Sequence, residues 1–170
     1  MRREILLVAA IVISAVSTAN AQKSRSFNTS DYTTALGVKV NPAISGAAVT
    51  FKHFINEGRA FEALGTFWNR GTRLTGLYEF TWDIRDAKGL KWYVGPGAHI
   101  GFYNDEYHNE NHYGDSYVGV GIDGVIGLDY KFNNIPLNLS VDWQPVVEFG
   151  NGRYSGFAGD FGGFSARYTF

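Results

Sequence analysis

The sequence contains no cysteine, a single methionine and four prolines in 170 residues. Without cysteine the chain can form neither disulfide bonds nor thiolate zinc sites, and it cannot carry the lipid anchor of a lipoprotein. An excess of charge of one sign is also missing, since 15 Lys and Arg nearly balance 16 Asp and Glu. No basic stripe indicates a nucleic-acid partner, and no acidic block indicates a disordered tail.

The residues that are abundant are glycine and the aromatics, with 21 Gly, 13 Phe, 10 Tyr and 4 Trp. After residue 22 no segment holds a helical apolar period of about 3.6 residues. No segment there is apolar over the roughly 20 residues that a membrane-spanning helix needs. This composition favours strands and close packing over helices.

The first 21 residues have the features of a secretory signal. Arg2 and Arg3 give the positive start, residues 5–13 form the apolar centre, and Ala19-Asn20-Ala21 has the small-residue form of a cleavage site. An uncleaved anchor is the alternative, but the apolar run is shorter than a spanning helix. We expect export, cleavage after Ala21, a short leader over 22–33 and one β-barrel domain over 34–170.

Alternation of apolar and polar residues recurs along the mature chain, which is the pattern of strands with two different faces, although the faces are mixed over 34–41, 46–55 and 60–68. In the clearest case Trp92, Val94 and Ile100 lie on one face, while Tyr93 and His99 lie on the other. The alternation predicts eight strands, at residues 34–41, 46–55, 60–68, 74–84, 90–102, 118–132, 137–149 and 160–170. An even number suits an up-and-down barrel.

The polarity of the two faces favours a membrane over water. Several segments exceed the about five or six residues of soluble strands and suit a tilted crossing of a bilayer. The apolar faces carry almost no charge, whereas the polar faces alternate charges with glycine. We therefore predict an all-β, antiparallel, transmembrane β-barrel of about eight strands with an interior polar network. The residues assigned to that network are Lys39, Glu79, Asp83, Lys91, His99, Asp123, Asp129, Lys131, Asp142, Glu148 and Arg167.

The predicted links agree with this orientation. Three links on one side are short turns, and the two longest links, 104–116 and 150–159, fall on the other side, as in outer-membrane barrels. Aromatic residues are expected in two bands, one at each rim. One band holds Trp82, Trp92, Tyr130, Phe132, Tyr168 and Phe170, and the other holds Phe67, Phe102, Phe149 and Phe161. Pro96 and Pro145 fall inside strands, so a bulge or local break is expected at each.

The C-terminal segment GGFSARYTF carries a resemblance to a known family. Phe164, Ala166, Tyr168 and Phe170 alternate up to the last residue, and this pattern is similar to the sorting signal of small bacterial outer-membrane β-barrel proteins. Nearly all of the mature chain resembles this family, which includes the OmpA and OmpX types. The resemblance implies a bacterial outer-membrane location, a surround of outer-membrane lipid and lipopolysaccharide, and recognition by the barrel-assembly machinery.

Two motifs have more ordinary explanations. Gly119, Gly121 and Gly124 match a dinucleotide-binding spacing, but the alternation continues to Phe132 and no helix opens to hold a phosphate. We expect these glycines to make room for large side chains across a narrow barrel. His108 and His112 lie among acidic residues and are competent metal ligands, but a spacing of four aligns them only on a helix. We expect no cofactor and no metal.

Several functions remain open. An eight-stranded barrel is filled by its own side chains, so we predict a plugged barrel, not an enzyme, with a structural role or an extracellular partner bound by loop 104–116. The alternatives are a narrow channel or small-ligand carrier, a lipid-modifying enzyme and a soluble periplasmic lipocalin-like barrel. An enzyme would require His99 to meet a rim serine, and the candidates are Ser45, Ser116 and Ser155.

Overall fold

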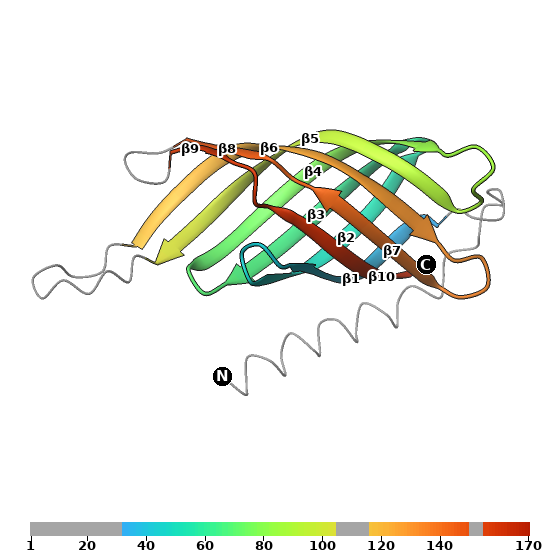
Figure 1. Ribbon diagram of the computed structural model, residues 1–170, viewed down its shortest axis with the longest axis horizontal. Helices are drawn as coiled ribbons and strands as arrows, with labels where there is room; N and C mark the ends of the chain where they lie inside the picture. The colour runs from blue at the N-terminus through green and yellow to red at the C-terminus, as the bar shows by residue number, and fades with distance from the viewer. Residues whose placement is uncertain (1–31, 105–115, 150–154) are drawn as a thin grey trace, which may run out of the picture.

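The computed structural model describes residues 32–104, 116–149 and 155–170, which form a closed antiparallel β-barrel (Figure 1). The strands are β1 (Thr34–Asn41), β2 (Gly46–Asn56), β3 (Arg59–Trp68), β4 (Gly71–Asp83), β5 (Leu90–Asn104), β6 (Ser116–Lys131), β7 (Leu137–Trp143), β8 (Val146–Phe149), β9 (Gly156–Ala158) and β10 (Gly162–Thr169). In the part of the chain that is described, no helix is long and apolar enough to cross a membrane.

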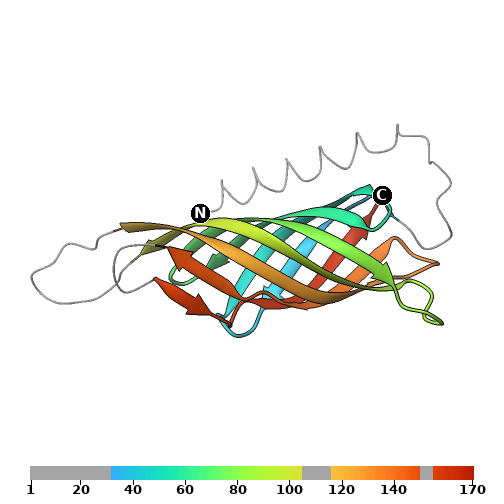
Figure 2. The same cartoon turned by 90° about the horizontal axis from the view of Figure 1, so that it is seen from above.

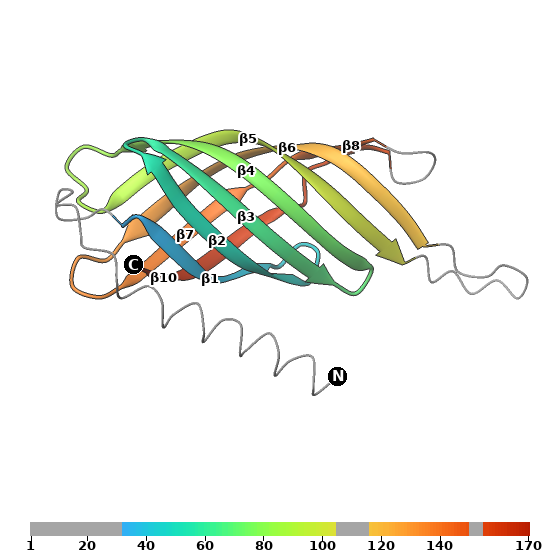
Figure 3. The same ribbon diagram turned by 180° about the vertical axis from the view of Figure 1, so that it is seen from behind.

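The ten segments build eight wall strands, because β7 with β8, and β9 with β10, are interrupted single strands. Each wall strand pairs with its neighbour in sequence, and β1 closes the barrel against β10 with Ala35 opposite Thr169. The β1–β10 pair is visible from both sides of the barrel (Figures 1 and 3). The predicted all-β, up-and-down barrel of eight strands is confirmed.

Both predicted proline irregularities are found. Pro96 lies on β5, and the β4–β5 ladder lacks pairs at this level, between Leu77–Gly97 and Phe80–Val94. Pro145 separates β7 from β8 and accepts a hydrogen bond from the Gly124 N–H at 2.8 Å. Proline has no N–H to donate to a ladder, so each pairing is interrupted while the register resumes beyond it.

The last wall strand differs from its predicted bounds. Residues 156–158 were predicted to lie in a link, but they form β9, and β10 begins at Gly162 and not at residue 160. Trp143 lies opposite Gly162 and Val146 lies opposite Ala158, so residues 144–145 face the three residues 159–161. This extra residue is a β-bulge, which a period of two cannot reveal.

The wall separates an apolar outer face from a polar interior. Many large apolar side chains on the outer face are 36 to 70 % exposed, among them Val38, Val118, Val120, Ile122, Ile126 and Leu139. The inward residues of the same strands are buried and largely polar, as along β4, where Arg73, Thr75 and Glu79 alternate with outward Leu74 and Phe80. Such inside-out polarity suits a wall surrounded by lipid.

The barrel has two unlike ends. We call the end that holds Tyr32 and Phe170 the terminal end, where the Thr33 N–H donates to the Phe170 carbonyl at 3.3 Å. The opposite end is the loop end, toward which β5 and β6, the longest strands, extend (Figure 2). At the terminal end Trp82 and Trp92 stack with centroids 4.4 Å apart. The predicted position of Phe161 in the loop-end band is wrong, because it packs inside the barrel beside Trp68.

Candidate functional site

The barrel interior holds two groups of charged side chains and an apolar layer. The first group, the terminal-end cluster, consists of Lys52, Glu62, Glu79, Asp129 and Arg167. The second, the mouth cluster, consists of Arg73, His99, Tyr103, Asp123 and Glu148. A buried apolar cluster is formed by Leu64, Leu77, Tyr93 and Val125.

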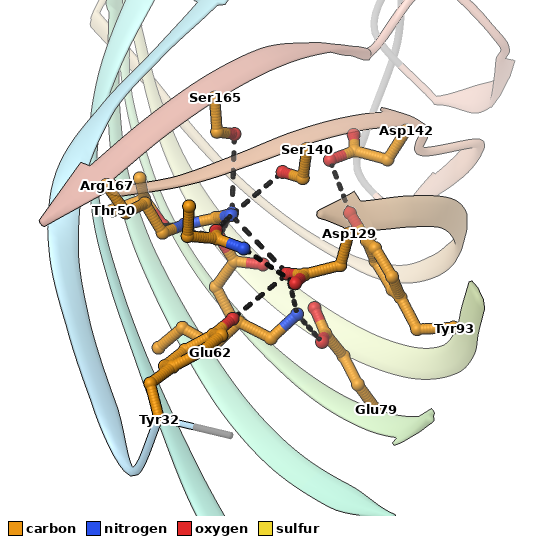
Figure 4. Close-up of polar contacts among 12 residues, drawn as sticks. Tyr32, Thr50, Glu62, Glu79, Tyr93, Asp129, Ser140, Asp142, Ser165 and Arg167 are labelled. Carbon is orange, nitrogen blue, oxygen red and sulfur yellow. Dashed lines mark hydrogen bonds and ion pairs between the residues drawn. The ribbon is translucent and has the colours of Figure 1, made fainter. Parts of the chain in front are cut away.

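Arg167 organises the terminal-end cluster (Figure 4). Its guanidinium pairs with Glu62 and donates to Asn138 Oδ1 at 3.1 Å and Ser140 Oγ at 2.8 Å. The remaining donors reach Thr50 Oγ1 at 3.1 Å and Ser165 Oγ at 3.3 Å. All five N–H donors of an arginine can be accounted for by these acceptors, so the buried charge is both paired and hydrogen-bonded.

Lys52 completes the terminal-end cluster and is itself fully buried. Its Nζ lies 2.7 Å from Glu79 Oε2 and 3.1 Å from Asp129 Oδ2. The Tyr32 hydroxyl donates to the same Asp129 oxygen at 3.0 Å. Lys52 Nζ also lies 4.2 Å from the centre of the Tyr93 ring, a favourable cation–π distance. The cross-section at this level is therefore occupied by side chains from opposite walls.

One ion pair, which we call the bridge, lies between the terminal-end cluster and the mouth cluster. Lys39 Nζ lies 2.6 Å from Asp142 Oδ1, and the Tyr93 hydroxyl donates to Asp142 Oδ2 at 2.9 Å. Beside Lys39 and Arg73 lies a chamber of about 10 Å³ that reaches Gln144. This volume accommodates about one water molecule.

The mouth cluster lies on the loop-end side of this bridge. Arg73 Nη2 donates to the Tyr103 hydroxyl at 2.8 Å, which in turn donates to Glu148 Oε2 at 2.7 Å. His99 Nδ1 lies 2.7 Å from Asp123 Oδ2, and its Nε2 lies 3.7 Å from Glu148 Oε2. Unlike Arg167, Arg73 leaves two nitrogens, Nε and Nη1, without a partner among the described residues.

Glycines on β6 make room for the mouth cluster. A Cβ on Gly119 would lie 2.0 Å from Glu148 Oε1, and one on Gly121 would lie 2.5 Å from His99 Cε1. Strand β6 runs through Gly119, Gly121 and Gly124 without opening a helix. The space-making role predicted for these glycines is confirmed by the contacts at the first two.

The structure brings together most of the residues assigned to the interior network. Those buried inside the barrel are Lys39, Glu79, His99, Asp123, Asp129, Asp142, Glu148 and Arg167. Lys52, Glu62 and Arg73 are also buried inside the barrel, but they were not among the residues assigned to the network from the sequence. Glu62 and Arg73 lie on β3 and β4, which also point leucine inward at Leu64 and Leu77, and these inward leucines obscure the alternation.

Three assigned residues lie at the terminal-end rim. Asp83 does not join the interior, since its side chain is 81 % exposed where β4 leaves the barrel, and it pairs with Lys91 at 3.3 Å. Lys131 ends β6 and donates to the carbonyls of Phe132 and Ile135, so it holds the β6–β7 turn. Where a strand extends beyond the barrel rim, a side chain that alternation assigns to the interior is exposed to solvent instead.

The remaining candidates lie around the loop end or outside the description. Ser45 and Ser155 line a cavity at the mouth, while among the described contacts His99 meets carboxylates and no serine. His108 and His112 fall within residues 105–115, which lie outside the described residues, as does the side chain of Ser116. The described residues contain no group of metal ligands of suitable geometry. Phe164, Ala166, Tyr168 and Phe170 are exposed on the outer face of β10 and at its end.

A closed eight-stranded antiparallel barrel with an apolar outer face and ion pairs inside has the fold of the small outer-membrane barrel domains. Among solved structures, the crystal structure of the N-terminal β-barrel domain of Pseudomonas aeruginosa OprF is similar, with a TM-score of 0.62. The match covers 81 % of this chain and 96 % of that chain at 11 % identity. The chain thus has the OmpA-type barrel fold. No family model and no curated protein matches the sequence.

Proposed function

We propose that this chain is an outer-membrane barrel with a sealed interior, which serves as a membrane anchor and presents its loop end to partners. The observation that carries the proposal is the occupation of the interior by paired side chains from opposite walls. Arg167 on β10 meets Glu62 on β3, and Lys52 on β2 meets Asp129 on β6. Pairs of this kind hold the walls together across the space that a channel would require.

The outer face supports the membrane location. Apolar side chains cover it along β1, β6 and β10, and stacked aromatics such as Trp82 and Trp92 mark the terminal-end rim. Phe164, Ala166, Tyr168 and Phe170 form an exposed row that is available to the barrel-assembly machinery. Contact with lipid and lipopolysaccharide over this band and partner binding by loop 104–116 belong to the same proposal.

The anchor proposal is tested by cell fractionation and by permeability. We expect recovery in the outer membrane and a compact detergent-resistant band that migrates differently after boiling. Liposomes that contain the purified barrel should swell in small sugars no faster than empty liposomes. A freely soluble protein without a heat-dependent shift would favour the lipocalin-like alternative, and rapid swelling would favour a channel.

A lipid-modifying activity receives less support from the geometry. An enzyme of that kind would place a nucleophile beside an activated base at the lipid-facing rim. His99 instead lies inside the barrel between Asp123 and Glu148, and its contacts are those of an interior ion-pair network. We therefore propose no catalytic set.

A further inference from the structure

The barrel wall is incomplete at the loop end. Strand β9 pairs along one edge with β8, where Val146 lies opposite Ala158, and within the described residues no strand pairs with its other edge. Its expected neighbour there, β1, ends at Asn41, and the β1–β10 register stops at Val40 opposite Phe164. We call the space between β9 and the β1–β2 turn, residues 42–45, the seam. Figure 1 shows β9 beside β8, away from that turn.

The seam begins where the backbone of β10 at Gly162 and Gly163 diverges from β1. Gly162 and Gly163 adopt φ values of +124° and +153°, which side-chain-bearing residues rarely adopt. A Cβ on Gly163 would lie 2.0 Å from the Val40 carbonyl oxygen. The bulge at residues 159–161 adds its extra residue immediately before these glycines. The chain thus leaves β1 at a position that only glycine fits.

A cavity of about 510 Å³ extends across the seam. From inside the barrel it is lined by Trp68, Phe161 and Arg73, and from the wall by Ile44 and Phe157. Phe157 is 70 % exposed and adjoins the outward-facing apolar surface of the barrel. The cavity therefore joins the mouth to the lipid-facing side, and its volume is within the range of about 300–1,000 Å³ for small-molecule sites.

Arg73 forms the polar floor of this cavity and is only 3 % exposed. Its guanidinium carbon lies 3.8 Å from the centre of the Phe161 ring, and Nη2 contacts Tyr103 and Glu148. Nε and Nη1, which carry three of the five N–H groups, have no partner in the described part of the chain. The adjacent chamber has room for about one water, and the larger cavity leaves space beside Arg73 for a group that accepts hydrogen bonds from these donors.

We propose that the cavity binds a single-chain alkyl carboxylate, the chemistry of a free fatty acid, which enters from the lipid side through the seam. The carboxylate accepts hydrogen bonds from Arg73, and the chain lies against Phe161, Trp68 and Phe157. Arg70, which is exposed at the cavity, adds a second positive charge that attracts a carboxylate. Asp160 and Glu148 also line the cavity, and their negative charges repel a carboxylate. Glu148 Oε1 also lacks a partner among the described residues, so a cationic amphiphile is the competing ligand.

The test uses the full mature barrel in amphipol, with [1-¹³C]dodecanoate as the probe and its carboxyl resonance as the readout. We expect about one bound dodecanoate per barrel, displaced by unlabelled dodecanoate. Dodecanol and dodecyltrimethylammonium should compete at least tenfold less well. Tighter binding of the ammonium compound would assign the site to Glu148, and tighter binding of dodecyl phosphate would assign it to a lipid phosphate. Either result would overturn the proposal.

Two variants separate the seam site from lipid bound around the barrel. Ala158→Trp fills the cavity from β9 and should abolish binding, whereas Ala98→Trp places the same ring on the exposed face of β5 and should leave binding intact. Arg73→Gln should weaken binding at least tenfold, with heat-modifiable migration as the check on folding. A site at the seam would be contradicted if Ala158→Trp bound dodecanoate as well as the wild type. It would also be contradicted if Ala98→Trp lost as much binding as Ala158→Trp.

Discussion

The two charged groups inside the barrel are built in different ways. In the terminal-end cluster Arg167 gives every N–H an acceptor, and the side chains that surround it are almost fully buried. In the mouth cluster Arg73 leaves two nitrogens unpartnered among the described residues and borders an open cavity. A buried ion pair is tolerated when its remaining hydrogen bonds are satisfied. The terminal-end cluster leaves only carboxylate oxygens without a hydrogen-bond partner among the described residues, namely Glu62 Oε2, Glu79 Oε1 and Glu79 Oε2. The contrast between the two arginines is the basis of our proposals that the terminal end closes the barrel and that the mouth binds a ligand.

Arg167→Leu should give the largest loss of stability. It would leave Glu62 buried without its cation, and breaking a buried pair on one side typically costs about 3–5 kcal/mol. The measurement is the free energy of unfolding in urea, taken on the barrel refolded in detergent micelles. Adding Glu62→Gln to this variant should recover part of the loss, because the uncompensated charge is then removed. If Arg167→Leu lost no more stability than Arg73→Met, the two charged clusters would not differ in the way proposed.

Gly163→Ala should have the next largest effect, because it alters the wall where β10 leaves the seam. The φ of +153° and the contact of the new Cβ with the Val40 carbonyl predict a cost of about 2 kcal/mol. Gly65→Ala on β3 is the matched control, since its Cβ would meet only the Phe67 ring at 3.9 Å. Equal urea midpoints for the two variants would show that the backbone at Gly163 is not constrained.

Arg73→Met should destabilise the barrel less than Arg167→Leu, by about 1 kcal/mol. Glu148 would lose its arginine, but it would keep the Tyr103 hydrogen bond and gain water from the cavity at the mouth. The same urea titration checks this value. A loss of the size expected for Arg167 would mean that the mouth is as closed as the terminal end.

Asp83→Asn should have the smallest effect, about 0.5 kcal/mol or less. Its ion pair with Lys91 lies at the rim with the Asp83 side chain exposed, where water screens the interaction. Thermal unfolding of the two proteins in parallel should give nearly the same midpoint. A clear drop would indicate that rim pairs, and not only interior pairs, hold the strand ends together.

Alternation in the sequence predicts the wall well where one face is uniformly apolar. Along β6, Val118, Val120 and Ile122 point outward as predicted. Around β3 the strand is predicted but its faces are mixed, because Leu64 points into the barrel beside Glu62. Asp83 follows the inward set in sequence, but the strand has already left the barrel there. A period of two predicts which side chains share a face of a strand, but it does not predict where the strand leaves the barrel.

The pairing of the interior charges was not predictable from the sequence. Arg167 and Glu62 are 105 positions apart, and they meet because β10 and β3 face each other across a closed barrel. The registers of all intervening strands determine this contact. The bulge at residues 159–161 was hidden for the same reason, since an extra residue shows only against its partner strand. Both features depend on how the strands pair around the closed barrel, and the sequence of a single strand does not determine that pairing.

Conductance in planar lipid bilayers tests the sealed interior most directly. Purified wild-type barrel and Arg73→Ser should both give no steady single-channel current, since the terminal-end cluster and the bridge through Lys39 and Asp142 remain in place. A porin inserted under the same conditions shows that the bilayer accepts barrels. Steady unitary currents from the wild-type protein would contradict the account, because they require a continuous aqueous path through the paired side chains.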